Sequence, residues 1–202
     1  MKPLLVGISG YAGSGKDEAA RALIKGGWRR QAFADRLRDF AYRQNPLVRT
    51  YPDVPPVRLA RLVDDLGWEQ AKRMFPQVRD VLVETGNTAR EILGVNVWVD
   101  AVLDRFRPDQ EALVIPDVRY RNEADAIQAR GGMLIRIERP GVGPATDPLG
   151  QPYESDTALD HYPFDHTYVN EGSIEDMHAF ILAVQLALPA LGCVTLSTTN
   201  VA

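Results

Sequence analysis

Residues 10–17 read Gly-Tyr-Ala-Gly-Ser-Gly-Lys-Asp, and this segment carries the strongest chemical signal in the chain. It matches G-x-x-x-x-G-K, in which backbone N–H groups surround an anion and the lysine reaches nucleotide phosphates. An apolar run precedes it and a helical pattern follows, so a helix N-terminus adds favourable charge. A glycine-rich turn with a chance lysine is the alternative. The phosphate-binding residues that we expect are Gly10, Ala12, Gly13, Ser14, Gly15, Lys16, Asp17 and Glu18.

Two carboxylates are candidate metal ligands. Asp17 stands where the pattern usually has Ser or Thr, and a carboxylate can also hold Mg²⁺, directly or through water. The alternative is that Asp17 only stabilises the helix N-terminus. Asp117 follows an apolar strand pattern, and ligands of open parallel sheets bind at the carboxyl ends of strands. It would hold the metal's water shell, unless Pro116-Asp117 merely forms a turn.

Arginines lie beside these acids. Arg119 and Arg121 follow Asp117, and guanidinium groups suit a site with several phosphate oxygens. The run 33–38, Phe-Ala-Asp-Arg-Leu-Arg, follows the second expected strand, where Asp35 would orient or deprotonate an acceptor oxygen. Arg36 and Arg38 would point in different directions on a helix, so we expect one of them to face the site. The catalytic candidates are Lys16, Asp35, Arg119 and Arg121.

A polar cluster interrupts an apolar helical region at residues 84–90. Arg90 would meet a phosphate and Asn87 a base edge. Glycine within a helix costs about 1 kcal/mol relative to alanine, so Gly86 indicates a break or a close ligand approach. A simple helix–turn–helix junction is the alternative. Trp98 is either a packing residue or part of an acceptor pocket.

Strand and helix patterns alternate at both ends of the chain. The expected strands are 3–9, 28–34, 112–115, 133–137 and 167–169. The expected helices around them are 17–25, 35–43, 120–129 and one that opens with a capping box at 173–176 and ends at Pro189. This alternation predicts a mostly parallel sheet with right-handed connections.

The middle of the chain differs, because residues 58–107 are helical almost throughout. We therefore predict a single domain over 1–202, with its core in 1–44 and 108–188. A helical insertion would occupy about 45–107, entered by the proline-rich segment 45–57. Residues 139–163 form a lid-like irregular loop, and 190–202 are a tail without a clear role.

Composition excludes several classes of protein. The 202 residues are 45% hydrophobic and 25% charged, with a net charge of −4, which argues against a protein that mainly coats nucleic acid. The single cysteine, Cys193, excludes an internal disulfide and a cysteine-based metal site. No apolar stretch reaches the roughly 20 residues of a membrane span, and no signal peptide is evident. We expect a cytoplasmic protein.

Several segments together resemble the phage-type deoxynucleoside monophosphate kinases, which are P-loop kinases of adenylate-kinase-like architecture; phosphomevalonate kinases are similar. The segments are 13–17 (Gly-Ser-Gly-Lys-Asp), 33–35 (Phe-Ala-Asp), 85–87 (Thr-Gly-Asn) with Arg90, 117–119 (Asp-Val-Arg), and Ser155-Asp156 with Asn170. The resemblance spans about residues 3–188. The chain departs from the family at Glu18, at Arg36-Leu37-Arg38 and at Asp156, where the family often has Thr, Pro-Leu-Lys and Glu.

The resemblance implies a three-layer α/β/α P-loop kinase fold with a five-stranded parallel sheet in the order 2-3-1-4-5. It implies Mg²⁺-dependent phosphorylation of deoxynucleoside 5′-monophosphates by ATP, with the insertion binding the acceptor and 119–121 and 139–160 closing over the phosphates. Arg139 would stack on adenine, and Asp17 and Asp117 would serve the metal. The implied substrate-binding residues are Arg36, Arg38, Thr85, Asn87, Arg90, Trp98, Asp117 and Arg119.

Other readings stay open. A different phosphorylated small molecule is the nearest alternative acceptor, and a non-catalytic nucleotide-binding regulator is an alternative of another class. We expect ATP and the monophosphate as partners, with no nucleic-acid polymer and no membrane, and a homodimer is possible. The compartment would be the host cytoplasm if a phage encodes the chain.

Overall fold

The computed structural model describes residues 4–107, 110–146 and 149–187. Its centre is a five-stranded sheet in which every neighbouring pair is parallel. The strands are β1 (Leu5–Ser9), β2 (Arg29–Arg30), β5 (Leu113–Ile115), β6 (Met133–Glu138) and β7 (His166–Val169). They lie in the order β2-β5-β1-β6-β7, which is 2-3-1-4-5 when only the strands of this sheet are counted along the chain. The predicted α/β fold class is confirmed.

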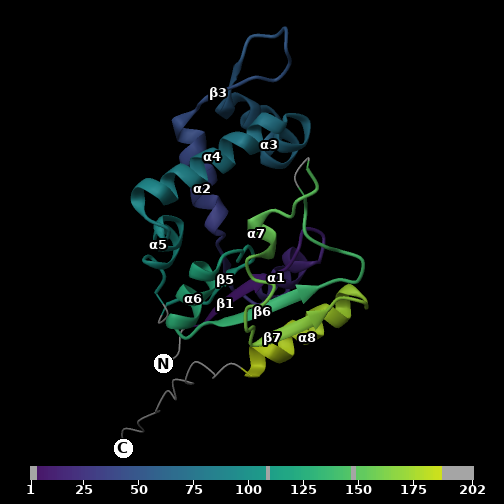
Figure 1. Ribbon diagram of the computed structural model, residues 1–202. Coiled ribbons are helices and arrows are strands. Elements are labelled where there is room, and N and C mark those ends of the chain that lie inside the picture. Colours follow the sequence, from purple (N-terminus) through teal and green to yellow (C-terminus); the bar gives the residue numbers. More distant parts are fainter. Residues whose placement is uncertain (1–3, 108–109, 147–148, 188–202) are drawn as a thin grey trace, which may run out of the picture.

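Helices cover both faces of the sheet (Figure 1). On one face, α1 (Lys16–Lys25) and α8 (Ile174–Ala187) pack against residues such as Val6 and Ile8. On the other, α5 (Val97–Leu103) and α6 (Arg121–Ala129) pack against Leu5, Leu113 and Ile115. All of β1 is buried, as its uninterrupted apolar run predicts for a strand covered on both sides.

The insertion stands above the sheet in Figure 1. It contains α3 (Leu59–Met74) and α4 (Pro76–Leu93), which pack with α2 (Phe33–Gln44) around a separate apolar core that includes Leu59, Leu62 and Val78. An antiparallel hairpin of β3 (Leu47–Val48) and β4 (Val57–Arg58) lies at its tip. The prediction of an all-helical insertion missed this hairpin. Asn45 reverses the chain at φ 51°, a left-handed conformation that asparagine tolerates.

The second predicted strand, 28–34, was too long. β2 covers only Arg29–Arg30, and α2 begins at Phe33, two residues before the predicted start at Asp35. Carboxylates explain the early helix: Asp35 Oδ2 accepts the Ala32 N–H at 3.1 Å, and Asp117 accepts the N–H groups of Phe33 and Ala34. These acceptors satisfy the first turn, whose N–H groups have no partner within the helix.

The expected interruption at Gly86 is wrong, and so is the helix–turn–helix alternative, because α4 runs unbroken through this residue. A Cβ on Gly86 would lie 3.3 Å from Leu37 Cδ2, so the glycine allows α4 to approach α2 closely. The break lies instead at Gly67, where φ is 73° and α3 kinks.

The segment 139–163 is less irregular than predicted. It contains an isolated bridge between Thr146 and Pro152 and the short helix α7 (Glu154–Thr157). Leu159 and Tyr162 are buried in the apolar core between the sheet and the helices α5 and α6, so the last part of the segment is fixed.

The capping box before α8 is confirmed, because Asp176 Oδ2 accepts the Ser173 N–H at 2.9 Å and Ser173 Oγ accepts the Asp176 N–H at 3.1 Å. α8 ends at Ala187; the predicted stop at Pro189 and the tail 190–202 lie outside the described residues. Within the described part of the chain, no helix has the length and apolar character to cross a membrane.

Candidate functional site

The loop between β1 and α1 has the backbone geometry of an anion site. Gly10, at φ 151°, passes so close to β6 that a Cβ there would lie 2.3 Å from the Ile137 carbonyl oxygen. Gly15 forms the N-cap of α1 at φ 105°, and the Ser14 N–H donates to the Tyr11 carbonyl at 3.1 Å. The Ser14 hydroxyl is buried with no hydrogen-bond partner in the described structure. The loop therefore surrounds the helix N-terminus, where a phosphate is stabilised.

Lys16 is almost buried, and its Nζ donates to the Tyr11 carbonyl at 3.3 Å. Burial lowers the pKa of Lys16, and the charge of Arg119 lowers it further, while Asp17, Asp156 and Asp117 raise it. The structure thus brings Lys16 within electrostatic reach of Arg119 and of both predicted metal ligands.

Arg119 is oriented by an acid that the sequence pattern alone did not assign. Its guanidinium forms an ion pair with Asp156, whose other oxygen accepts the Ala145 N–H at 2.9 Å. Asp156 therefore connects Arg119 to the segment after β6. Arg121 lies beside an aromatic ring instead, with its guanidinium carbon 6.0 Å from the centre of the Tyr162 ring.

Asp117 has a structural role that the sequence did not predict. Its Oδ1 accepts the Phe33 N–H at 3.0 Å and its Oδ2 accepts the Ala34 N–H at 2.9 Å. Burial raises the pKa of Asp117, whereas these two hydrogen bonds lower it. The carboxylate thus holds the N-terminus of α2 to the end of β5. Asp35 lies in the same first turn of α2 and is paired with Arg30 at 2.8 Å.

No protein-only metal cage exists among residues 4–107, 110–146 and 149–187, which hold no cluster of three or more suitable side chains. Asp17 is exposed on the first turn of α1, and each Asp117 oxygen already accepts an N–H. Mg²⁺ at kinase sites takes one or two carboxylates besides phosphates and water. The two acids fit such a metal–nucleotide complex and do not fit a permanently bound ion.

Glu123 completes the N-terminus of α6 beside this site. Its Oε2 accepts the N–H groups of Arg119 at 2.7 Å and Tyr120 at 3.0 Å. Burial raises the pKa of Glu123 from an ordinary value of 4.5 to about 7, assisted by the charge of Asp117 and opposed by the two N–H groups.

The free energy of unfolding is expected to fall as the pH rises from about 4.5 to above about 7, because Glu123 loses its proton in this range. The folded protein holds the Glu123 proton more tightly than the unfolded chain, so the contribution is complete below about pH 4.5 and lost as the pH passes about 7. Between about pH 5 and about pH 8 we expect a loss of about 2 to 3 kcal/mol from this group. Urea unfolding at both pH values should show a smaller difference for Glu123→Gln. An unchanged difference would assign the pH dependence to other groups.

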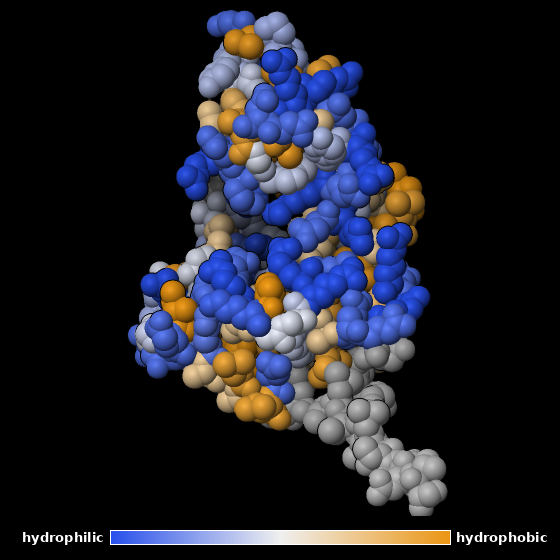
Figure 2. Space-filling view, turned by 180° about the vertical axis from the view of Figure 1, so that it is seen from behind, coloured by the Kyte–Doolittle hydropathy of each residue, from blue (hydrophilic) through white to orange (hydrophobic). Residues whose placement is uncertain are grey.

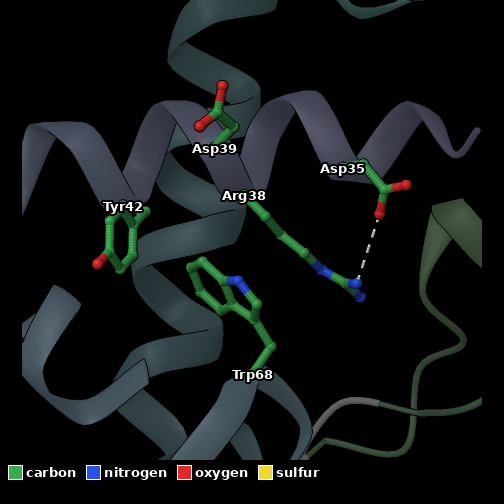
Figure 3. Close-up of a pocket in the computed structure, with 5 residues that line it drawn as sticks. All are labelled: Asp35, Arg38, Asp39, Tyr42 and Trp68. Atoms are coloured by element: carbon green, nitrogen blue, oxygen red, sulfur yellow. Dashed lines mark ion pairs between the residues drawn. The ribbon is translucent and has the colours of Figure 1, made fainter. Parts of the chain in front are cut away.

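A pocket of about 270 Å³ opens between α2 and α3, where the insertion packs against α2, and it is lined by Asp35, Arg38, Asp39, Tyr42 and Trp68. Figure 3 shows Arg38 extending from α2 toward Asp35, with the Trp68 indole facing the stem of the arginine. The Arg38 guanidinium lies 3.8 Å from Asp35 and 3.4 Å from Glu69. The pocket combines an aromatic face with charged groups. Figure 2 shows that the molecule is hollowed between the insertion and the sheet-containing part, with hydrophilic residues at the edge.

The other residues predicted to bind the acceptor lie in different surroundings. Arg90 stacks 3.9 Å over the Tyr120 ring, which joins α4 to the N-cap of α6. Trp98 Nε1 donates to the Gly86 carbonyl at 3.4 Å and its ring packs against Phe40, which favours the packing interpretation. The remaining predicted residues lie on α2 and α4 and do not line this pocket: Arg36, Thr85 and Asn87.

A larger cavity of about 640 Å³ lies beside the phosphate loop, a volume typical of small-molecule sites. It includes Gly15, Glu18 and the predicted Arg139 in its wall. The loop after β7 forms another side, and Asn170 Nδ2 donates to the Ser14 carbonyl at 2.8 Å. The full lining is Gly15, Glu18, Arg139, Pro140, Asn170, Glu171, Gly172, Ile174 and Met177.

Three residues around the loop were not predicted: Tyr11, Arg136 and Asp160. Arg136 had a usable signal, because a charged residue inside the buried strand pattern 133–137 requires a buried partner. Asp160 had none, since nothing in the pattern of the segment after β6 distinguishes it from its neighbours.

No protein-family model matches the chain. The chain is similar to a protein of Acanthamoeba polyphaga mimivirus named "Putative deoxynucleotide monophosphate kinase". The two sequences are 26% identical over 198 residues, and the alignment covers 89% of this chain and 95% of the mimivirus protein.

Among solved structures, TT1252 from Thermus thermophilus matches with a TM-score of 0.50 and 18% identity, over 94% of this chain and all of that one. The dephospho-CoA kinase from Campylobacter jejuni matches with a TM-score of 0.46 and 11% identity, over 90% and 95% of the two chains. The match to TT1252 supports a shared fold.

Proposed function

We propose that this protein transfers the γ-phosphoryl group of ATP to a deoxynucleoside 5′-monophosphate. The observation that carries the proposal is the gathering of Lys16 and Arg119 at the glycine loop, with one cavity beside the loop and a second between α2 and the insertion. A donor and an acceptor would thus have separate places. The name of the mimivirus protein supports the same reaction.

In the proposed reaction, an oxygen of the acceptor phosphate bonds to the γ-phosphorus while the bond to the β–γ bridging oxygen breaks, and ADP leaves. Such transfer depends on positioning and on neutralising charge. Lys16 and Arg119 would supply positive charge to the transferring group. Asp17 and Asp117 would hold Mg²⁺, directly or through water, and the bound metal would neutralise charge on the phosphates.

The two cavities suggest how the substrates would be held. The larger one, with Arg139 in its wall, would take the adenosine of ATP. In the smaller one, the Trp68 face would stack on the acceptor's base, and Arg38, held by Asp35, would meet a polar group of the acceptor.

A coupled assay of ADP release tests the proposal, using the four deoxynucleoside monophosphates, their ribose counterparts and phosphomevalonate as acceptors. We expect at least one deoxynucleoside monophosphate to stimulate ADP release most strongly. Stimulation by phosphomevalonate alone would change the acceptor class. No stimulation by any acceptor, with ATP bound, would leave a nucleotide-binding regulator.

Arg38→Ala tests the acceptor pocket separately. We expect KM for the acceptor to rise about tenfold, because a hydrogen bond to a charged group is lost. Arg61→Ala is the matched control, since Arg61 is an exposed arginine of the insertion, 3.8 Å from Asp65 on α3. Equal KM values in the two variants would exclude the pocket as the acceptor site.

A further inference from the structure

Tyr11 connects the phosphate loop to residues far along the chain. Its hydroxyl donates to Asp160 Oδ1 at 2.7 Å. The guanidinium carbon of Arg136 lies 5.0 Å from the centre of the Tyr11 ring, and Arg136 Nη2 donates to the same Asp160 oxygen at 2.8 Å. One tyrosine of the loop is thus held through both its ring and its hydroxyl.

Arg136 is a rigid support for this contact. It lies on β6 in register with Ser9, the last residue of β1 before the loop, and it is only 6% exposed. Its guanidinium also donates to the Leu159 carbonyl at 3.3 Å and lies 3.3 Å from Glu138. Since Leu159 is fully buried, Asp160 is held next to a residue of the core.

The main chain of Tyr11 contacts Lys16, which would take part in the proposed reaction. The Tyr11 carbonyl accepts Lys16 Nζ at 3.3 Å and the Ser14 N–H at 3.1 Å. Glycines at 10, 13 and 15 give the loop backbone wide conformational freedom. A fixed Tyr11 reduces that freedom before a nucleotide binds, so less ordering is required on binding.

We propose that Arg136 and Asp160 are positioning residues for the phosphate loop and act on it through Tyr11. This inference rests on the proposed function in so far as the loop binds ATP. A tyrosine hydroxyl is protonated and able to donate at neutral pH, and burial, followed by the hydrogen bond to Asp160, raises the pKa of Tyr11 further.

The test is a double-mutant cycle on the Kd of Mg·ATP, measured by calorimetric titration without acceptor for the wild type, Tyr11→Phe, Asp160→Asn and the double variant. Tyr11→Phe keeps the ring beneath Arg136 and removes only the hydroxyl, and we expect Kd to rise about fivefold. The double variant should bind no more weakly than Asp160→Asn alone, because both changes remove the same hydrogen bond.

Tyr162→Phe is the matched control, because the Tyr162 hydroxyl also lies 2.7 Å from an aspartate, Asp125, but within the described residues it makes no hydrogen bond to the loop. Its Kd should equal that of the wild type, and thermal unfolding should show Tyr11→Phe folded. An unchanged Kd for Tyr11→Phe, or additive effects in the cycle, would overturn the inference.

Lys16→Ala in the same titration separates this inference from the proposed function. If Lys16→Ala weakens binding and Tyr11→Phe does not, only the positioning role fails. If wild-type protein does not bind Mg·ATP, or Lys16→Ala binds it equally well, the proposed nucleotide site itself fails.

Discussion

The Lys16→Met variant is expected to lose about 10²- to 10³-fold in kcat for acceptor-dependent ADP formation while remaining folded. The side chain is almost buried, and among the described residues its Nζ donates only to the Tyr11 carbonyl, so methionine replaces most of its volume and loses the charge. Burial already lowers the pKa of Lys16, which means that the environment disfavours a charge when no phosphate is present. A buried lysine charge at this position is therefore better explained by the binding of an anionic ligand than by a contribution to folding stability.

Initial rates at saturating ATP and acceptor measure this effect, and thermal unfolding measures the fold. Lys25→Met is the matched control, because Lys25 is an exposed lysine at the opposite end of the same helix. It should retain wild-type turnover. If Lys16→Met kept more than about a tenth of the wild-type kcat, the loop would not be the site of phosphoryl transfer.

Asp117→Ala is expected to lower the free energy of unfolding by about 2 to 4 kcal/mol, since it leaves two partly buried N–H groups without an acceptor. Those groups belong to Phe33 and Ala34, the first residues of α2, so the loss also removes a negative charge from a helix N-terminus. Because α2 packs with α3 and α4, we expect the insertion to loosen first. Denaturant unfolding measures the change.

Asp117→Asn separates stability from chemistry at this position. The amide oxygen can still accept one of the two N–H groups, so we expect about half the loss of stability. A loss of activity in folded Asp117→Asn at low Mg²⁺ that is restored at high Mg²⁺ would support a metal role. Asp104→Ala is the surface control, since Asp104 is an exposed aspartate 3.3 Å from Arg130. Equal stability of Asp117→Ala and Asp104→Ala would contradict the assigned role in α2.

Local features of the chain were predictable because their causes are local. The glycine spacing of residues 10–15 and the lysine after it define a turn into a helix within seven residues. The Ser173–Asp176 capping box likewise needs only four residues. The wrong predictions arose where a distant group decided the outcome: Asp117 starts α2 early, and Leu37 explains Gly86.

The proline-rich segment 45–57 shows the opposite problem. Prolines at 46, 52, 55 and 56 suggested a stiff connection, yet two short strands pair around it. Proline restricts its own φ and removes one donor, but it does not prevent the residues between prolines from pairing. The prediction relied on the proline content of the segment, whereas in the structure Leu47 pairs with Arg58 and Val48 pairs with Val57.

By itself, the sequence determined the parallel sheet, the phosphate loop and the presence of an insertion, since each follows from periodicity or from a short contiguous pattern. Only the tertiary structure decided which polar and charged groups meet at the loop. Asp156 reaches Arg119 across 37 residues, Asp160 reaches Tyr11 across 149, and Asn170 reaches Ser14 across 156. The physical reason is that hydrogen bonds and ion pairs depend on distance in space, and the order of strands in the sheet sets that distance.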